Sequence, residues 1–316
     1  MNIENALHLD SSKIGDYMRC PRYYFYKHVC GWTHTGTNRD LIFGQAWHLA
    51  KEWYLITGDV AASIDRFEKY YRQYYTPDTD LTNAPKNLGN AELALVQYDK
   101  QYKNNKHKIV LMNGKPATEI FGSVTVGEGR TVEFRLDAIC VDENGVYYYV
   151  DHKTGSQNNA SYQNRYHLSM QMLVYYHVVN CIYNPKDVSG GVVDLSLFKK
   201  GGNEHIRIPI RKTVGMMNEW LWIVNRWYGL IEHDCKGVSR QIEDQHASDD
   251  DYDTVMYAFP KNDNGCADYG RTCTFYDFCL AWPNPLARVN EPPEGFKEEY
   301  WSPFNQKEEN NTIITI

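Results

Sequence analysis

The sequence has no long apolar run and no targeting segment at its start. None of its apolar stretches approaches the roughly 18 consecutive residues that a membrane-spanning helix needs. The opening residues, MNIENALHLDSS, lack the basic stretch followed by an apolar stretch that is typical of a signal peptide. These absences argue against an integral membrane protein, and we expect a cytoplasmic protein with no membrane partner.

The sequence also lacks an excess of positive charge. It has 33 Lys and Arg residues against 40 Asp and Glu residues, a formal net charge of −7. This balance excludes a protein that coats nucleic acid through bulk positive charge. It does not exclude an enzyme that acts on nucleic acid, because such an enzyme needs only a local basic groove and its metal site requires carboxylates. The hydrophobic share of 42% is typical of a globular protein with a sizeable core.

Hydrophobic periodicity predicts helices first and a mixed α/β region after them. We expect helices over 11–29, 41–56 and 91–104, with helical sequence to about residue 75 and a polar loop over 76–90. Ser11 or Ser12 would cap the first helix, and Pro21 would either kink that helix or start a new one. The later elements are expected in this order: strands at 117–126, 131–141 and 145–153, a polar loop over 154–166, a helix over 167–182, strands at 190–198 and 204–210, a helix over 213–233, an acidic loop over 240–264, a cysteine-bearing segment and an irregular Pro- and Glu-rich tail over 286–316. This order predicts an α/β core.

Two of the predicted strands carry a pair of aspartates. Asp137 lies seven residues before Asn144 (144 − 137), and Asp151 lies seven residues after it (151 − 144). A hairpin that turns at Asn144 would make the two aspartates cross-strand neighbours. Residues two apart on a strand share a face, so Lys153 would point the same way as Asp151, and His152 would point the opposite way.

Adjacent carboxylates repel each other unless a cation lies between them. A divalent metal ion is one solution, and Lys153 beside it could orient the attacking water. The alternative is an exposed ion pair at the end of a strand, which stabilises a protein little. Further polar residues could join the site: Glu119 on the preceding strand, His48 on the second helix, and Gln171 with Tyr175, four residues apart on a later helix.

Three cysteines, Cys266, Cys273 and Cys279, lie within one short stretch late in the chain. In a reducing compartment, clustered thiols indicate a metal site before a disulfide. A tetrahedral thiolate site needs four ligands, so the fourth would come from elsewhere in the sequence. The 25 tyrosines offer rings on which single-stranded bases could stack, although tyrosine also fills protein cores.

In their order, these motifs resemble the RecB-like exonucleases of the PD-(D/E)XK nuclease superfamily, in the branch that includes CRISPR-associated exonucleases with an iron–sulfur cluster. The similar segments run from about residue 11 to residue 282 and are YMRCPRYYFYKHVCGW, GQAWH, TEIF, FRLDAI, VDHKTG, QMLVYY and the three late cysteines. The resemblance implies a restriction-endonuclease-like α/β fold: a mixed central sheet flanked by helices, with an N-terminal helical region and a C-terminal cysteine-bearing segment.

The resemblance also assigns roles to the candidate residues. A Mg²⁺ or Mn²⁺ ion would be bound by His48, Asp137, Asp151 and the backbone carbonyl of His152. Lys153 would assist the attacking water, and Glu119 would support the metal site. Gln171 and Tyr175 would help to position DNA.

A second metal centre follows from the same resemblance. Cys20 would be the fourth thiol, joining Cys266, Cys273 and Cys279 around a [4Fe–4S] cluster. Six residues, 267 to 272, separate Cys266 from Cys273, where the family usually has two. Zinc therefore stays open as an alternative metal.

Residues 1–285 would form a single nuclease domain, with a mainly helical part at 11–105, an α/β catalytic core at 106–235 and a metal-cluster segment at 260–285. Residues 286–316 would form the tail. The expected function is that of a metal-dependent DNA exonuclease that hydrolyses phosphodiester bonds of single-stranded DNA or DNA ends.

The expected setting is recombination, repair or phage DNA processing in a bacterial or phage-infected cell, with recombination or replication proteins as partners. Arg22, Tyr23 and Tyr24, near the first helix, are expected to contact DNA. The alternative function is that of a DNA-end-binding subunit of a recombination or spacer-capture complex, with little or no cleavage.

Overall fold

The computed structural model describes residues 1–247, 255–268, 271–302, 304 and 312–316. The chain forms two compact units, each assembled from three separate stretches. The first unit comprises Met1–Gly36, Thr125–Glu133 and Asn218–Asn305, and the second comprises Thr37–Val124, Phe134–Met217 and Gln306–Ile316. Each unit thus combines early and late parts of the chain, and the domain ranges expected from the sequence stay a prediction.

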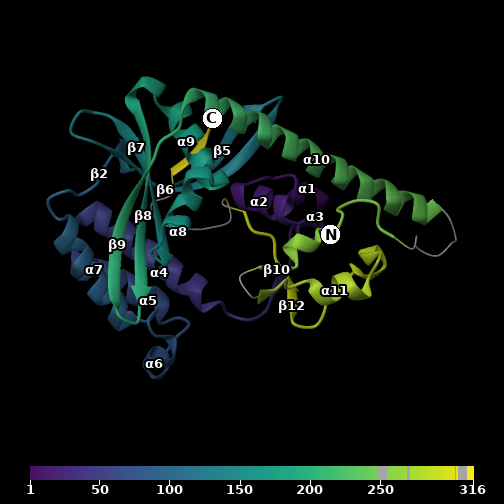
Figure 1. Cartoon of the computed structure of the whole chain (residues 1–316), viewed down its shortest axis with the longest axis horizontal. Coiled ribbons are helices and arrows are strands. Elements are labelled where there is room, and N and C mark those ends of the chain that lie inside the picture. The colour runs from purple at the N-terminus through teal and green to yellow at the C-terminus, as the bar shows by residue number, and fades with distance from the viewer. Residues whose placement is uncertain (248–254, 269–270, 303, 305–311) are drawn as a thin grey trace. The chain divides into compact units, whose positions relative to one another are not determined.

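The second unit is built on a central mixed sheet (Figure 1). Its described strands follow the order β13-β5-β6-β7-β8-β9, and β2 pairs with β6. The pairs β6–β7 and β8–β9 are antiparallel, whereas β7–β8 and β13–β5 are parallel. The bounds are β2 Lys108–Ile109, β5 Thr118–Gly127, β6 Arg130–Val141, β7 Tyr147–Gly155, β8 Val188–Lys199, β9 Gly202–Ile210 and β13 Thr312–Thr315, beside a small separate pair, β3 Leu111–Met112 and β4 Lys115–Pro116.

Helices cover both faces of this sheet, and side-chain alternation along the strands separates the two faces. On one face, Phe43 and Trp47 of α4 contact Phe198 of β8 edge-on. On the other face, Tyr149 of β7 donates a hydrogen bond to the backbone carbonyl of Met172 in α9. The helices of this unit are α4 Arg39–Thr57, α5 Val60–Tyr71, α6 Asp80–Asn83, α7 Leu88–Tyr102, α8 Ala160–Asn164 and α9 Met170–Ile182. The mixed sheet with flanking helices confirms the predicted fold class.

The first unit is mainly helical. Asp10 caps α2, because its carboxylate accepts hydrogen bonds from the backbone N–H groups of Ser12 and Lys13 at 2.6 and 2.9 Å. The predicted N-cap, Ser11 or Ser12, was therefore wrong, because the true N-cap lies one or two residues earlier. Pro21 occupies the first turn of α3, so the second of the two predicted outcomes, a new helix, is the one found. The described elements are α1 Ile3–Ala6, α2 Ser11–Arg19, α3 Pro21–Tyr24, a π-helical turn Phe25–Val29, β1 Trp32–His34, α10 Val214–Ala247 with its first turn in the second unit, β10 Ala267–Asp268, β11 Arg271–Thr272, α11 Tyr276–Ala281 and β12 Phe296–Glu298.

Several segments predicted to be irregular are ordered elements. The helix α10 continues to Ala247, so the first part of the predicted acidic loop is helical, and residues 248–254 lie outside the described residues. The predicted polar loops contain the short helices α6 and α8. The predicted tail contains β12, which pairs with β1, and β13, which joins the central sheet. For the extension of α10, polarity misled the prediction, because the Arg, Gln and Glu residues of RQIEDQ are good helix formers.

A packing test follows from Gly191 of β8, which lies against the ring of Tyr149. A Cβ atom at Gly191 would come within 2.1 Å of that ring, and the Tyr149 hydroxyl is held by Met172 at 3.1 Å. We expect Gly191→Ala to lower the free energy of unfolding by about 1–3 kcal/mol through overpacking, measured by urea denaturation. The control is Gly89→Ala on α7, where nothing lies within 4 Å of the added carbon and no loss is expected. Equal losses in both variants would contradict this packing.

Candidate functional site

The candidate site begins where β6 and β7 part. Their described pairing extends from Val141 and Tyr147 to Ala138 and Val150. The next residues along this register are Asp137 and Asp151, so the predicted hairpin register is confirmed. Beyond this point the strands separate, and the backbone N–H of His152 donates to Asp137 Oδ2 at 2.7 Å. A side-chain carboxylate thus takes the place of a backbone carbonyl in the ladder.

Side chains alternate along β7 as predicted. Lys153 Nζ donates to Asp151 Oδ1 at 2.9 Å, so these two side chains share a face. His152 points to the opposite face, toward Asp194 of β8. Asp151 is fully buried, whereas the Lys153 side chain keeps 25% of its surface exposed. Lys153 therefore connects a buried carboxylate with the accessible surface.

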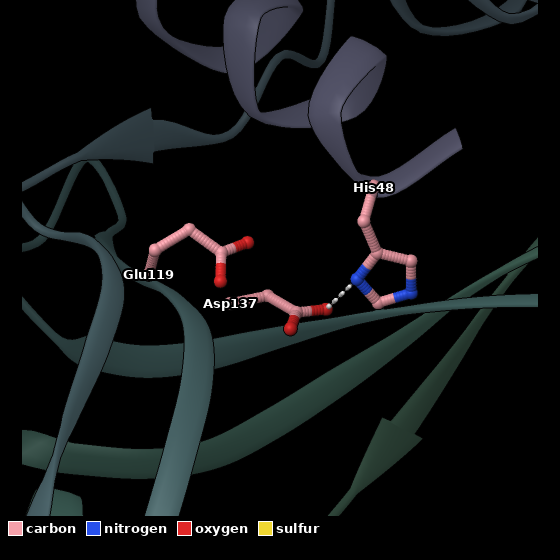
Figure 2. Close-up of side chains that lie close together, drawn as sticks. All are labelled: His48, Glu119 and Asp137. Atoms are coloured by element: carbon pink, nitrogen blue, oxygen red, sulfur yellow. Dashed lines mark ion pairs between the residues drawn. The ribbon is translucent and has the colours of Figure 1, made fainter. Parts of the chain in front are cut away.

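Two further side chains converge on Asp137, as Figure 2 shows. His48, from α4, places Nδ1 3.3 Å from Asp137 Oδ2. Glu119, from β5, directs its carboxylate into the same space. One ligand atom from each of His48, Glu119 and Asp137 lies within 4.8 Å of the others. An imidazole and two carboxylates form a donor set that suits Mg²⁺ or Mn²⁺.

Asp151 lies outside this group of three, although it neighbours Asp137 along the register. Its Oδ1 is held by Lys153, and its Oδ2 is buried without a hydrogen-bond partner. Leaving a buried carboxylate oxygen unpaired is costly, and a bound cation would satisfy it. The donor set and this unpaired oxygen together fit a divalent cation.

Glu119 is held in a strained backbone conformation. Its φ of 45° lies in the left-handed region, which few residues other than glycine adopt. Strain of this kind costs about 1–3 kcal/mol and clusters at functional sites. Arg135 of β6 fixes the side chain, with Nε 2.6 Å from Glu119 Oε2. Arg135 was not among the residues predicted for the site. It lies two residues before Asp137 on a strand, and this spacing, which puts both side chains on one face, could have indicated it.

Burial and neighbouring charges move the pKa values of the two aspartates apart. Burial raises the pKa of Asp151 to about 6, in spite of the nearby Lys153. Burial also acts to raise the pKa of Asp137, but the surrounding bases, His48 first, outweigh it and hold that pKa below its usual range. For His48, burial acts to lower the pKa, and contact with Asp137 outweighs this and raises it. Carboxyl groups with pKa values separated in this way are typical of active sites.

Gln171 and Tyr175 lie on α9 beside β6. Gln171 Nε2 donates to the Tyr175 hydroxyl at 2.8 Å, and that hydroxyl donates to the backbone carbonyl of Arg135. Tyr175 is buried and Gln171 is half-buried. Tyr175 therefore attaches α9 to the strand that carries Asp137, and Gln171 is the member of the pair with surface left for a DNA contact.

The three residues of α3 expected to contact DNA lie in the first unit. Arg22 and Tyr24 are buried, and Arg22 Nε donates to the backbone carbonyl of Phe259 at 3.0 Å. Their side chains are turned into the protein, and their contact with DNA stays a prediction. Tyr23 is half-buried, with Lys27 Nζ 5.3 Å from the centre of its ring.

The four cysteines predicted to form a metal centre lie near one another in the first unit. Cys20 separates α2 from α3, and Cys279 lies on α11. Cys266 and Cys273 flank the β10–β11 hairpin, with the N–H of Cys273 donating to the carbonyl of Cys266 at 2.8 Å. The segment before Cys266 is held against the end of α2, because Arg19 Nη2 donates to the carbonyl of Gly265 at 3.1 Å.

The spacing of these thiols bears on the kind of metal centre that they could form. All four are free thiols. Burial raises the pKa of Cys273 and that of Cys279, the latter to about 11, and Cys20 adds to both shifts. Within the described residues, no three cysteine sulfurs lie within 4.8 Å of one another. Zinc–sulfur bonds of about 2.3 Å in a tetrahedron would bring the sulfurs to about 4 Å.

Comparison with known proteins places the chain in a family. Among the described residues, no helix has the length and apolarity to cross a bilayer. No curated protein matches the chain. A solved structure from Eubacterium rectale, named "Putative exonuclease", is 15% identical over 74% of this chain and 83% of its own, with a TM-score of 0.46. The protein SSO0001 is 14% identical over 59% of this chain and 85% of its own, with a TM-score of 0.26. The model of the PD-(D/E)XK nuclease superfamily matches residues 9–279, so the chain belongs to this superfamily of nucleases.

Proposed function

We propose that this nuclease is a Mg²⁺- or Mn²⁺-dependent DNA exonuclease that hydrolyses phosphodiester bonds in single-stranded DNA or at DNA ends. The observation that carries the proposal is the meeting of Asp137, Asp151 and Lys153 where β6 and β7 part. Two buried carboxylates and a partly exposed amine at one point suit phosphodiester hydrolysis better than they suit a structural ion pair.

The residues of the site divide the chemical work. His48, Asp137 and Asp151 would hold the cation, together with the backbone carbonyl of His152, and Glu119 would complete or brace the donor set. A cation bound there would stabilise charge on the phosphate oxygens and lower the pKa of its bound water. Lys153 Nζ can orient that water or donate to a phosphate oxygen, because its ammonium group carries three donors and Asp151 occupies one of them.

The requirement for ends is tested with paired substrates. Linear oligonucleotides labelled at the 5′ or 3′ end are compared with circular single-stranded DNA, each in Mn²⁺ and in EDTA. An exonuclease shortens the linear strands progressively, spares the circle and stops in EDTA. Cleavage of the circle would show an endonuclease. Binding of ends without metal-dependent cleavage would favour a DNA-end-binding subunit.

Replacing Lys153 separates catalysis from metal binding. We expect Lys153→Ala to lower the cleavage rate at saturating Mn²⁺ by about 10²–10⁴-fold while DNA affinity changes little, because the amine acts chiefly in the transition state. Single-turnover rates and DNA binding are measured for both proteins. Lys199→Ala is the matched control, since Lys199 also pairs with a carboxylate, that of Glu204 at 2.7 Å, but on an exposed part of the sheet. A wild-type rate in Lys153→Ala would show that the segment VDHKTG is an ordinary strand end and not part of an active site.

Metal affinity should depend on pH with a definite sign. The carboxyl of Asp151, with its pKa raised to about 6, must lose its proton to bind a cation, and so must the His48 imidazole, whose pKa is also raised. Mn²⁺ affinity should therefore fall about tenfold or more per pH unit below pH 6 and rise toward pH 7.5. Calorimetric titration at pH 5, 6 and 7.5 measures this slope. The slope should flatten in Asp151→Asn, and a flat wild-type profile would contradict the assignment.

For the first unit, we propose that Cys20, Cys266, Cys273 and Cys279 hold a [4Fe–4S] cluster. Thiolates are the ligands of such clusters, and zinc stays open as the alternative metal. Cations near the thiols would offset the negative charge of the cluster. The charge of Arg19 acts to lower the pKa of Cys273, and the charge of Lys261 acts to lower the pKa of Cys279.

Anaerobic purification tests this centre. We expect brown protein with about four iron atoms per chain, and Cys20→Ser should lose the colour and unfold at a lower temperature, because the cluster joins distant stretches of the first unit. Cys181→Ser, at an exposed cysteine of the second unit, is the control and should keep both. Colourless wild-type protein with one zinc ion would reject the iron cluster.

A further inference from the structure

A second group of buried charges lies within the second unit, on the sheet face opposite Asp151. Its centre is Asp194 of β8, which is fully buried. Asp194 Oδ2 accepts a hydrogen bond from the Tyr98 hydroxyl at 2.6 Å and lies 3.0 Å from Lys51 Nζ. Lys51 is also fully buried, so one complete ion pair is enclosed in the protein.

Lys51 ties this ion pair to the helix that carries His48. The two residues are three apart on α4 (51 − 48), so they lie one turn apart on adjoining faces of the same helix. His48 reaches Asp137 at 3.3 Å, while Lys51 reaches Asp194 at 3.0 Å. The ion pair therefore fixes α4 against β8 at the turn next to the candidate metal ligand.

His152 ties Asp194 to the strand that carries Asp151. In the parallel register of β7 and β8, His152 and Asp194 are direct partners, and His152 Nδ1 lies 3.4 Å from Asp194 Oδ2. The backbone of the same His152 donates its N–H to Asp137 at 2.7 Å. The side chain of His152 is thus held behind the sheet while its backbone lies within the site.

One carboxylate oxygen therefore contacts both elements that bring ligands to the candidate metal site. A buried ion pair contributes little net stability compared with apolar side chains of the same size, because both charges lose their hydration. It does fix geometry, because each partner is strongly penalised for moving away. These features are better explained by a role in positioning than by a role in stability.

We propose that Asp194, with Lys51, is a positioning residue for the metal site: it fixes α4 and His152 so that His48 and the His152 backbone face the cation. This inference rests on the proposed metal-dependent function. Neither residue belongs to the proposed set of metal ligands. Outer groups that orient metal ligands typically contribute about 10–100-fold to metal affinity.

The test removes both charges while keeping the volume. Lys51→Met combined with Asp194→Asn leaves no unpaired buried charge, and the new amide can still contact Tyr98 and His152. We expect Mn²⁺ affinity, measured by calorimetry on the protein without DNA, to fall about 10–100-fold, while urea denaturation stays cooperative. Cleavage should also fall, and excess Mn²⁺ should restore much of it, an effect that a purely structural role would not produce.

Two further variants make the result decisive. His152→Asn keeps the backbone but withdraws the ring from Asp194, so it should weaken Mn²⁺ binding in the same way even if the double variant does not fold. Ser196→Ala is the matched control: Ser196 is fully buried on the same face of β8, where it pairs with His205 at 3.0 Å, and Mn²⁺ affinity should not change.

The possible results distinguish a failure of the positioning role from a failure of the proposed nuclease function. Wild-type Mn²⁺ affinity in His152→Asn and in a folded double variant would overturn the positioning role and leave the nuclease proposal intact. An equal loss of affinity in Ser196→Ala would also overturn it, because the effect would then be a general response to change on that face. Wild-type protein that neither binds Mn²⁺ nor cleaves DNA would refute the proposed function, and the positioning role with it.

Discussion

The hydrogen bond from the His152 backbone to the Asp137 carboxylate is the contact on which the candidate site depends. Two strands of a sheet can part only if the backbone groups released from the ladder find other partners. Here the carboxylate of Asp137 accepts the released N–H at 2.7 Å, and its position between the strands also brings it to His48. The same side chain therefore takes up the released N–H and contacts His48 in the candidate site, so a change at Asp137 would affect both the sheet and the candidate site.

The sequence predicts this part of the molecule well, because two short-range rules are sufficient for it. The distances of Asp137 and Asp151 from Asn144 set the hairpin register, and the alternation of a strand sets which side chains face the site. Contacts between residues far apart follow no such rule. Lys51 and Asp194 are separated by 143 positions (194 − 51), and each lies in a segment that reads as ordinary helix or strand. Arg135 was missed for the same reason, since its partner Glu119 lies on another strand.

For the aromatic residues, the sequence does not show which role each side chain has. A tyrosine ring can stack on a base or fill a core, and composition does not distinguish the two uses. In the first unit the core use dominates: Tyr24 stacks on Phe259, and Tyr26 stacks on Trp32, all of them buried. For the cysteines, the sequence predicted which segments lie near one another: the CPR segment and the late cysteines. Their spacing in the sequence does not identify the metal that they would hold.

The parallel pairing of β13 with β5 has a consequence for how the second unit folds. Thr312 pairs with Ile120, so 192 positions (312 − 120) separate the two strands. Contacts that close so long a loop form late, because the entropy of the intervening chain opposes them. Until then the outer edge of β5, with its run of β-branched and aromatic residues, presents unpaired backbone groups that can recruit a strand from another molecule. In the folded unit, β13 covers part of this edge, so the strand that pairs last is also the one that removes a site for pairing between molecules.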